Sequence, residues 1–288
     1  MKTVYPNYYS KFRCIADKCK HSCCIGWEID IDEDTIELYN SLDGELAEKI
    51  RASIEGEVPH FVLGENKRCP FLNEKGLCDI ITGYGDGAIC DICYLHPRFS
   101  NFYSAFEEVG LGLCCEEAAR IILTENEKFT IEIPDCATEE EIEFLKARKG
   151  VFDILQDRTK NVAERFSILA KKLGFEFCAE KVYRLYVSLE RLDENWTAEL
   201  EKIKSFDEAV FKDEKLQIFF EQLACYLVFR HFKGDAKEIK FALIGCCVIG
   251  AMCRNAEFEK ALDISRMYSS EIEYSEENVE AIMRFVEG

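Results

Sequence analysis

The chain has 288 residues, 16 of them cysteine, and a formal net charge of −19 at pH 7. This length allows one or two domains with a substantial hydrophobic core, so the chain is large enough to be stable without disulfides. The charge disfavours a nucleic-acid partner, because phosphate binding depends on lysine and arginine side chains, and it favours a basic peptide or protein instead.

The N-terminal residues lack the apolar segment of a secretory signal. The longest strongly apolar run, residues 241–253, is shorter than the roughly 20 residues that cross a bilayer. We therefore expect a cytoplasmic protein without a membrane contact. In a reducing cytoplasm, clustered cysteines are typical of metal-binding or catalytic sites rather than of disulfides.

The first expected elements follow a cysteine-rich stretch at residues 14–24. Apolar and polar residues alternate over 27–32, which predicts a half-buried strand. Asp32 or Asp34 then caps a predicted helix that ends at Leu42, and Gly44 separates it from a second helix over 45–54.

Residues 69–78 predict a metal knuckle. A turn signal over 73–76 lies between two apolar pairs, and a hairpin closed by this turn brings Cys69 and Cys78 together on its two arms. Pro70 suits an edge position in such a hairpin.

Two further cysteine pairs follow. A short helix over 88–95, ended by Pro97, places Cys90 and Cys93 on one face. Residues 101–112 are expected to be extended, and a helix begins at Cys114 and Cys115, where the helix dipole favours a thiolate.

This concentration of cysteines predicts a metal centre. Structural zinc takes four sulfur or nitrogen ligands, and iron–sulfur clusters take four cysteine thiolates. The sequence supplies enough thiolates for one centre with spare cysteines or for two centres, and it does not distinguish zinc from iron–sulfur. The predicted metal ligands are Cys14, Cys19, Cys23, Cys24, Cys69, Cys78, Cys90, Cys93 and Cys115.

Other side chains near these cysteines receive different interpretations. We expect His21 and His96 to lie beside the metal rather than to ligate it. Arg98 is the candidate cofactor-binding residue, because a guanidinium can hold a carboxylate with two hydrogen bonds; an ordinary salt bridge is the alternative. Trp27, Phe99 and Phe102 are expected in the core.

The second half of the chain is predicted to be almost entirely helical. A polar run with Pro134 suggests a linker, which gives a metal-binding domain over 1–124 and a helical domain over 138–288. Cys178, Cys225, Cys246, Cys247 and Cys253 lack metal spacing and are expected in the core. The predicted helices lie near 138–157, 159–173, 176–192, 207–232, 236–254, 257–270 and 276–287. The predicted fold class is thus mainly α, with an irregular cysteine-rich N-terminal domain that contains short strands and an all-α domain after it.

Common enzyme motifs do not match. Cys19 and Cys23 have the first spacing of the radical S-adenosylmethionine motif, but Gly26 stands where its third cysteine would be. The chain has no Gly-rich dinucleotide fingerprint, phosphate-binding loop, nucleophile elbow or zinc-protease helix. Composition and spacing alone therefore indicate an intracellular metalloprotein.

The cysteine strings themselves resemble a known family. The order Cys14-x4-Cys19-x3-Cys23-Cys24-x2-Trp27, then Cys69-Pro-Phe-Leu-Asn-Glu-Lys-Gly-Leu-Cys78, Cys90-x2-Cys93-x2-His96-Pro97-Arg98 and Cys115-Glu-Glu-Ala-Ala, is similar to that of the flagellin lysine N-methylases. The helical half carries a further likeness at residues 154–158 and 226–232.

The resemblance implies methyl transfer from S-adenosylmethionine to lysine side chains of a flagellin-like protein. It also implies an iron–sulfur cluster of the four-iron (4Fe-4S) type held by the cysteines. The alternative is a non-catalytic zinc- or iron-binding protein whose helical half is a partner-binding scaffold.

Overall fold

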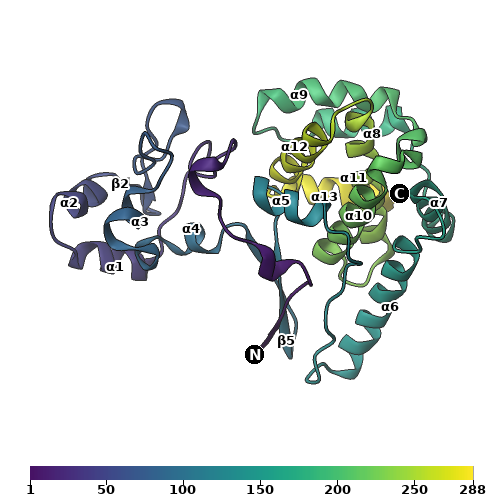
Figure 1. Ribbon diagram of the computed structural model, residues 1–288, viewed down its shortest axis with the longest axis horizontal. Coiled ribbons are helices and arrows are strands. Elements are labelled where there is room, and N and C mark those ends of the chain that lie inside the picture. Colours follow the sequence, from purple (N-terminus) through teal and green to yellow (C-terminus); the bar gives the residue numbers. More distant parts are fainter. Residues whose placement is uncertain (288) are drawn as a thin grey trace. The chain divides into compact units, whose positions relative to one another are not determined.

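The computed structural model describes residues 1–287 and separates the chain into two compact units (Figure 1). The cysteine unit consists of residues 13–99. The helical unit combines residues 1–12 with the chain from Ser100 onward. Helices dominate and the strands are few and short, which confirms the predicted mainly α fold class. The predicted domains, 1–124 and 138–288, stay a prediction.

The cysteine unit contains short helices and a small antiparallel sheet. Its elements are α1 (Glu33–Ser41), α2 (Glu45–Ala52), β2 (Ile54–Glu55), β3 (His60–Phe61), α3 (Asp79–Tyr84) and α4 (Asp91–Leu95). The predicted cap of α1 is confirmed, because Asp32 accepts a hydrogen bond of 2.8 Å from the backbone N–H of Thr35. Gly44 precedes α2 with φ 100°, a conformation that glycine adopts without strain.

The strand predicted over 27–32 is wrong as a regular strand. Its backbone is extended and lies beside β3, with the N–H of Ile31 bonded to Pro59 at 2.8 Å and that of Phe61 to Ile29 at 3.3 Å. The ladder is limited to one isolated bridge between Asp30 and His60. The pairing is therefore real but too short to form a strand.

The helical unit holds most of the chain's regular structure (Figure 1). Its strands are β1 (Lys2–Val4), β4 (Arg98–Phe102), which begins just before Ser100, and β5 (Phe106–Leu111). They form one sheet in the order β1-β5-β4, with β1 parallel to β5. Its helices are α5 (Glu116–Leu123), α6 (Glu139–Leu155), α7 (Val162–Leu173), α8 (Ala179–Ser188), α9 (Glu194–Leu200), α10 (Gln217–His231), α11 (Ala236–Cys253), α12 (Phe258–Tyr268) and α13 (Glu276–Glu287).

Helix α11 is the centre of the helical unit, as its apolar sequence predicts. It packs against α7, α10, α12 and α13 and is buried along nearly its whole length. Gly245 allows close approach of α12, because a Cβ at this position would lie 2.8 Å from the hydroxyl of Tyr268. Asp235 starts the helix with a capping box completed by Glu238.

The helix predicted over 207–232 begins only at Gln217. Asp207 and Asp213 each accept a hydrogen bond from a backbone N–H two residues later, and each starts a short 3₁₀ helix instead. Aspartate side chains compete with helical hydrogen bonds in this way. Helix α9 and strand β1 have no counterpart in the sequence-based prediction.

Several core predictions are wrong. Cys178 is exposed at the residue before α8, although Cys225, Cys246, Cys247 and Cys253 are buried as expected. Trp27 is 38% exposed, because its indole N–H donates to the carbonyl of Cys23 at 2.6 Å and so holds the ring on the surface of the loop. Phe102 is 69% exposed at the end of β4.

Candidate metal centre

The structure gathers five of the nine predicted ligands in one apolar core of the cysteine unit. Cys69 and Cys90 are buried in this core, and Cys24, Cys78 and Cys93 pack against it. We call these five residues the cysteine core. They come from four segments of the chain, so only folding brings these side chains into one core.

The turn after Cys69 brings the first three of these cysteines together. The N–H of Cys69 donates to the carbonyl of Cys24 at 2.9 Å, and Leu72 bridges Cys78 in antiparallel fashion. The side-chain oxygen of Asn73 accepts the N–H groups of Lys75 at 2.9 Å and Leu77 at 3.0 Å, which closes the turn. The predicted proximity of Cys69 and Cys78 is confirmed.

Helix α4 supplies the remaining pair. Cys90 is the residue before its first turn, and Cys93 lies inside it. The carboxylate of Asp32 accepts the N–H of Asp91 at 2.9 Å, so the cap of α1 also holds the start of α4. One aspartate thereby ties together two segments that frame the core.

Burial and mutual hydrogen bonding set the protonation of these thiols. Burial raises the pKa of Cys69 to about 11 and also raises the pKa of Cys78. The hydrogen bond between Cys93 and Cys90 lowers the pKa of Cys90 and raises that of Cys93, so Cys90 is the acceptor of this pair. A hydrogen bond from Cys23 is the main cause that lowers the pKa of Cys24 to about 6.

The other predicted ligands lie outside this core. Cys14 and Cys23 are exposed and Cys19 is half-buried, all in the loop before α1. The sulfur of Cys14 accepts the N–H of Ala16 at 3.4 Å. Cys115 belongs to the helical unit, at the residue before α5, as the sequence predicts. Their part in metal binding stays a prediction.

His96 lies two residues before β4, and Arg98 is the first residue of this strand. The guanidinium of Arg98 donates to the carbonyl of Tyr94 at 3.2 Å. Burial lowers the pKa of His96 to about 4, so its imidazole is neutral at pH 7. The role of Arg98 toward a cofactor stays a prediction.

The cysteine core offers the type of donor atom that zinc and iron–sulfur clusters take. It offers sulfur alone, whereas magnesium and calcium prefer oxygen ligands. Among residues 1–287, no three His, Cys, Asp or Glu side chains take the arrangement of ligands around a single ion.

A second group of polar side chains is buried in the helical unit and was not foreseen from the sequence. Glu273, whose side chain is fully buried, lies 2.7 Å from the Nε2 of His231 and 3.4 Å from the Nε of Arg230. Tyr226 donates to the same carboxylate at 3.0 Å. We call these four residues the Glu273 cluster. The sequence analysis named Tyr226, Arg230 and His231 only as part of the likeness at residues 226–232, and nothing in it indicated Glu273 as their partner.

The Glu273 cluster is built on unusual backbone. Residues Ser269–Glu273 form one turn of π-helix, a feature that is often found at functional sites. Arg230 stacks on Tyr274 at 4.9 Å, and Gly112 faces both, because a Cβ there would lie 2.7 Å from the Tyr274 hydroxyl. The sulfur of Cys114 donates to this hydroxyl at 3.0 Å.

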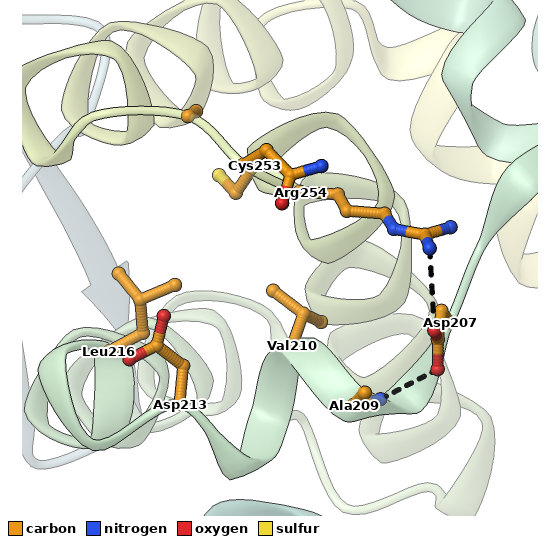
Figure 2. A pocket seen from close by; sticks show the side chains of 9 residues that line it. Asp207, Ala209, Val210, Asp213, Leu216, Cys253 and Arg254 are labelled. Atoms are coloured by element: carbon orange, nitrogen blue, oxygen red, sulfur yellow. Dashed lines mark hydrogen bonds and ion pairs between the residues drawn. The ribbon is translucent and has the colours of Figure 1, made fainter.

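Figure 2 shows a pocket of about 290 Å³ near the C-terminal end of α11. Asp207 and Arg254 form an ion pair of 3.7 Å at one side of it, and Cys253, Val210 and Leu216 also line it. The pocket contains none of the predicted site residues.

In the part of the chain that the structure describes, no helix combines the length and the apolar character needed to span a bilayer.

Comparisons with known proteins found curated relatives. The chain is 29% identical over 134 residues to a protein named lysine-N-methylase from Salmonella choleraesuis (strain SC-B67), and 28% identical over 134 residues to one of the same name from Salmonella typhimurium (strain LT2). Each match covers 42% of this chain and 32% of the relative, so the chain matches about a third of the length of these relatives.

A third relative is a flagellar biosynthetic protein, FliU, from Salmonella muenchen. It is 28% identical over 131 residues, which cover 42% of this chain and 76% of that protein. No family model matches the chain, and no solved structure matches it. The predicted resemblance is confirmed by the named relatives.

Proposed function

Because this chain is a relative of the lysine N-methylases, we propose that it is a protein lysine N-methyltransferase whose cysteine unit holds an iron–sulfur cluster. The observation that supports the metal is the cysteine core, in which five cysteine side chains from four chain segments pack in or against one apolar core. We further propose a flagellin-like protein as the substrate, in line with the name of the third relative.

The residues that would hold the cluster belong to the cysteine core. Four thiolates are needed, and Cys69, Cys78, Cys90 and Cys93 form two pairs that the turn and α4 position. Cys24 is the additional sulfur, and a hydrogen bond from Cys23 lowers its pKa. When bound, an iron–sulfur cluster supplies a redox-active centre, whereas zinc would supply a structural crosslink.

The proposed reaction moves a methyl group from the sulfonium of S-adenosylmethionine to a lysine amine. The ammonium first loses a proton to a base; the nitrogen lone pair then forms the C–N bond while the C–S bond breaks, and its electron pair stays on sulfur. The net charge of −19 favours the approach of a lysine-bearing substrate. We propose that Arg98 contacts the carboxylate of S-adenosylmethionine, because its guanidinium suits such a group.

The test begins with anaerobic purification and measurement of iron, zinc and acid-labile sulfide. The loaded protein is then incubated with flagellin and isotope-labelled S-adenosylmethionine, and label on lysine is measured by mass spectrometry. We expect stoichiometric iron and sulfide together with methylated lysine. Flagellin with acetylated lysines is the control and should take up no label.

Two results would change the assignment. Zinc without sulfide, together with no methyl transfer to any lysine-containing protein, would favour the non-catalytic scaffold. Methyl transfer by a protein that contains neither iron nor zinc would support the methyltransferase activity but contradict the proposed cluster.

A further inference from the structure

The pocket of about 290 Å³ in the helical unit has walls from two segments that are separated in the sequence (Figure 2). One wall is the turn after α11, which is closed by a hydrogen bond of 2.9 Å from the N–H of Ala256 to the carbonyl of Cys253. The other wall is formed by the 3₁₀ helices Glu208–Lys212 and Glu214–Leu216 and the residues before each of them. Both walls belong to the helical unit, so folding of this one unit forms the pocket.

The lining of the pocket combines an apolar surface with carboxylates. In Figure 2, the side chains of Val210, Leu216 and Asp213 point into the same space. Leu216 is buried, whereas Asp213 is exposed. A ligand that fits this space therefore needs an apolar part that packs on Val210 and Leu216 and a cationic part that stays near water at Asp213.

The two carboxylates of the pocket differ in the partners that they already have. Asp207 forms the ion pair of 3.7 Å with Arg254 and accepts the N–H of Ala209 at 2.9 Å. One side-chain oxygen of Asp213 accepts the N–H of Lys215 at 2.9 Å, and within residues 1–287 no cationic side chain pairs with this carboxylate. Asp213 can thus accept a cation without the loss of an existing ion pair.

We propose that the pocket binds a lysine side chain of the substrate protein, with its methylene groups against Val210 and Leu216 and its ammonium at Asp213. Lysine suits both parts of the lining, because its methylene stem packs on apolar surface while its charged end stays in water. This inference rests on the proposed function, since it names where the substrate protein docks. None of the predicted metal or cofactor residues lines the pocket, so we assign the bound lysine the role of an anchor rather than of the methyl acceptor.

The charge of Asp213 should have a measurable but modest effect on affinity. Asp213 is exposed, and loss of an exposed ion pair weakens binding by at most about fivefold. Asparagine caps helices as well as aspartate does, so Asp213→Asn removes the charge while the start of the 3₁₀ helix is kept. Glu214→Gln is the matched control, because it removes the same charge one residue later, at a side chain that does not line the pocket.

Binding is measured by NMR spectroscopy on the full-length, isotope-labelled protein. The probes are lysine blocked at its backbone amine and carboxyl groups and the norleucine analogue, which has the same carbon chain without the amine. We expect the lysine probe to shift the amide signals of Ala209, Val210 and Ala256 in a saturable manner and to bind more tightly than the norleucine probe. Asp213→Asn should weaken lysine binding by about threefold to fivefold, and Glu214→Gln should not.

Two binding results would overturn the inference. The first is the absence of shifts at the pocket signals when the lysine probe is added. The second is equal affinity of wild type and Asp213→Asn for the lysine probe, which would show that the carboxylate does not bind the ammonium. Because this experiment needs no methyl transfer, its result is separate from that of the methylation assay.

The docking role is tested by the kinetics of flagellin methylation. We expect Asp213→Asn to raise KM for flagellin by a factor similar to its loss of lysine affinity and Glu214→Gln to leave KM unchanged. An unchanged KM in Asp213→Asn would overturn the docking role while leaving the methyltransferase in place. A wild type that binds the lysine probe at this pocket but methylates no protein would contradict the proposed function, and the lysine site would stand without it.

Discussion

The Glu273 cluster permits a quantitative prediction through Glu273→Gln. Burial opposes ionisation of this carboxyl, but the guanidinium of Arg230 and the hydrogen bond from His231 outweigh it and lower the pKa to about 2. Glutamine keeps the size of the side chain and a hydrogen-bond acceptor but removes the charge. The variant therefore isolates what the ionised carboxylate contributes.

The magnitude follows from the pKa difference. The ordinary pKa is 4.5 and the folded-state value is about 2, which corresponds to about 3 kcal/mol of folding free energy at neutral pH. Because folding lowers this pKa, the stabilisation is present above pH 4.5 and is lost as the pH falls toward 2. We expect Glu273→Gln to be less stable by about 3 kcal/mol at pH 7, in line with the cost of leaving a buried Arg230 unpaired.

Urea unfolding followed by circular dichroism measures this difference between pH 7 and 3.5. The gap between wild type and variant should close by about 1.4 kcal/mol per pH unit below 4.5. Glu280→Gln is the control, because Glu280 pairs with Arg284 at 3.2 Å on the surface and should change stability by less than about 1 kcal/mol. A gap that stays constant down to pH 3.5 would show that the charge of Glu273 is not its source.

Two other predictions concern the cysteine unit. Cys69→Ser should lower the amount of bound metal measured by elemental analysis. Cys247→Ser is the control and should not lower it, because Cys247 lies on α11 and is as buried as Cys69, each at 7% exposure. Equal metal loss in both variants would mean that burial rather than ligation matters. A fragment of residues 13–99 should retain the metal but not methylate lysine, as judged by metal content and label transfer, and full activity of the fragment would contradict a role for the helical unit in presenting substrate.

The sequence predicted elements best where local chemistry decides them. The cap at Asp32 and the turn after Asn73 each involve residues within a few positions, and the structure confirms them. The prediction was wrong in the segment before α10, which contains two aspartates. The spacing of apolar residues around Asp207 and Asp213 predicted a helix from residue 207. Both side chains instead accept hydrogen bonds from backbone N–H groups two residues later, so α10 begins only at Gln217.

The candidate site was predicted as a set of residue types but not as a group in space. Spacing identified cysteine pairs, yet nothing local distinguishes Cys24, which packs on the core, from Cys23, which is exposed. The distinction arises from the backbone bond between Cys69 and Cys24, two segments 45 positions apart in the sequence. A pairing of this kind depends on the folded chain, so the sequence alone left both cysteines as ligands.

The Glu273 cluster also could not be predicted from the sequence, because its members are far apart in the chain. Tyr226 and Arg230 stand one turn apart on α10, a spacing that predicts a shared face but no partner. Their carboxylate comes from a π-helical turn more than 40 residues later, and this turn is what aims Glu273 at them. A buried charge is tolerated only when such partners are in place, so the cluster links the end of α10 to the turn after α12. We infer that these two elements form cooperatively, because neither can bury its charge without the other.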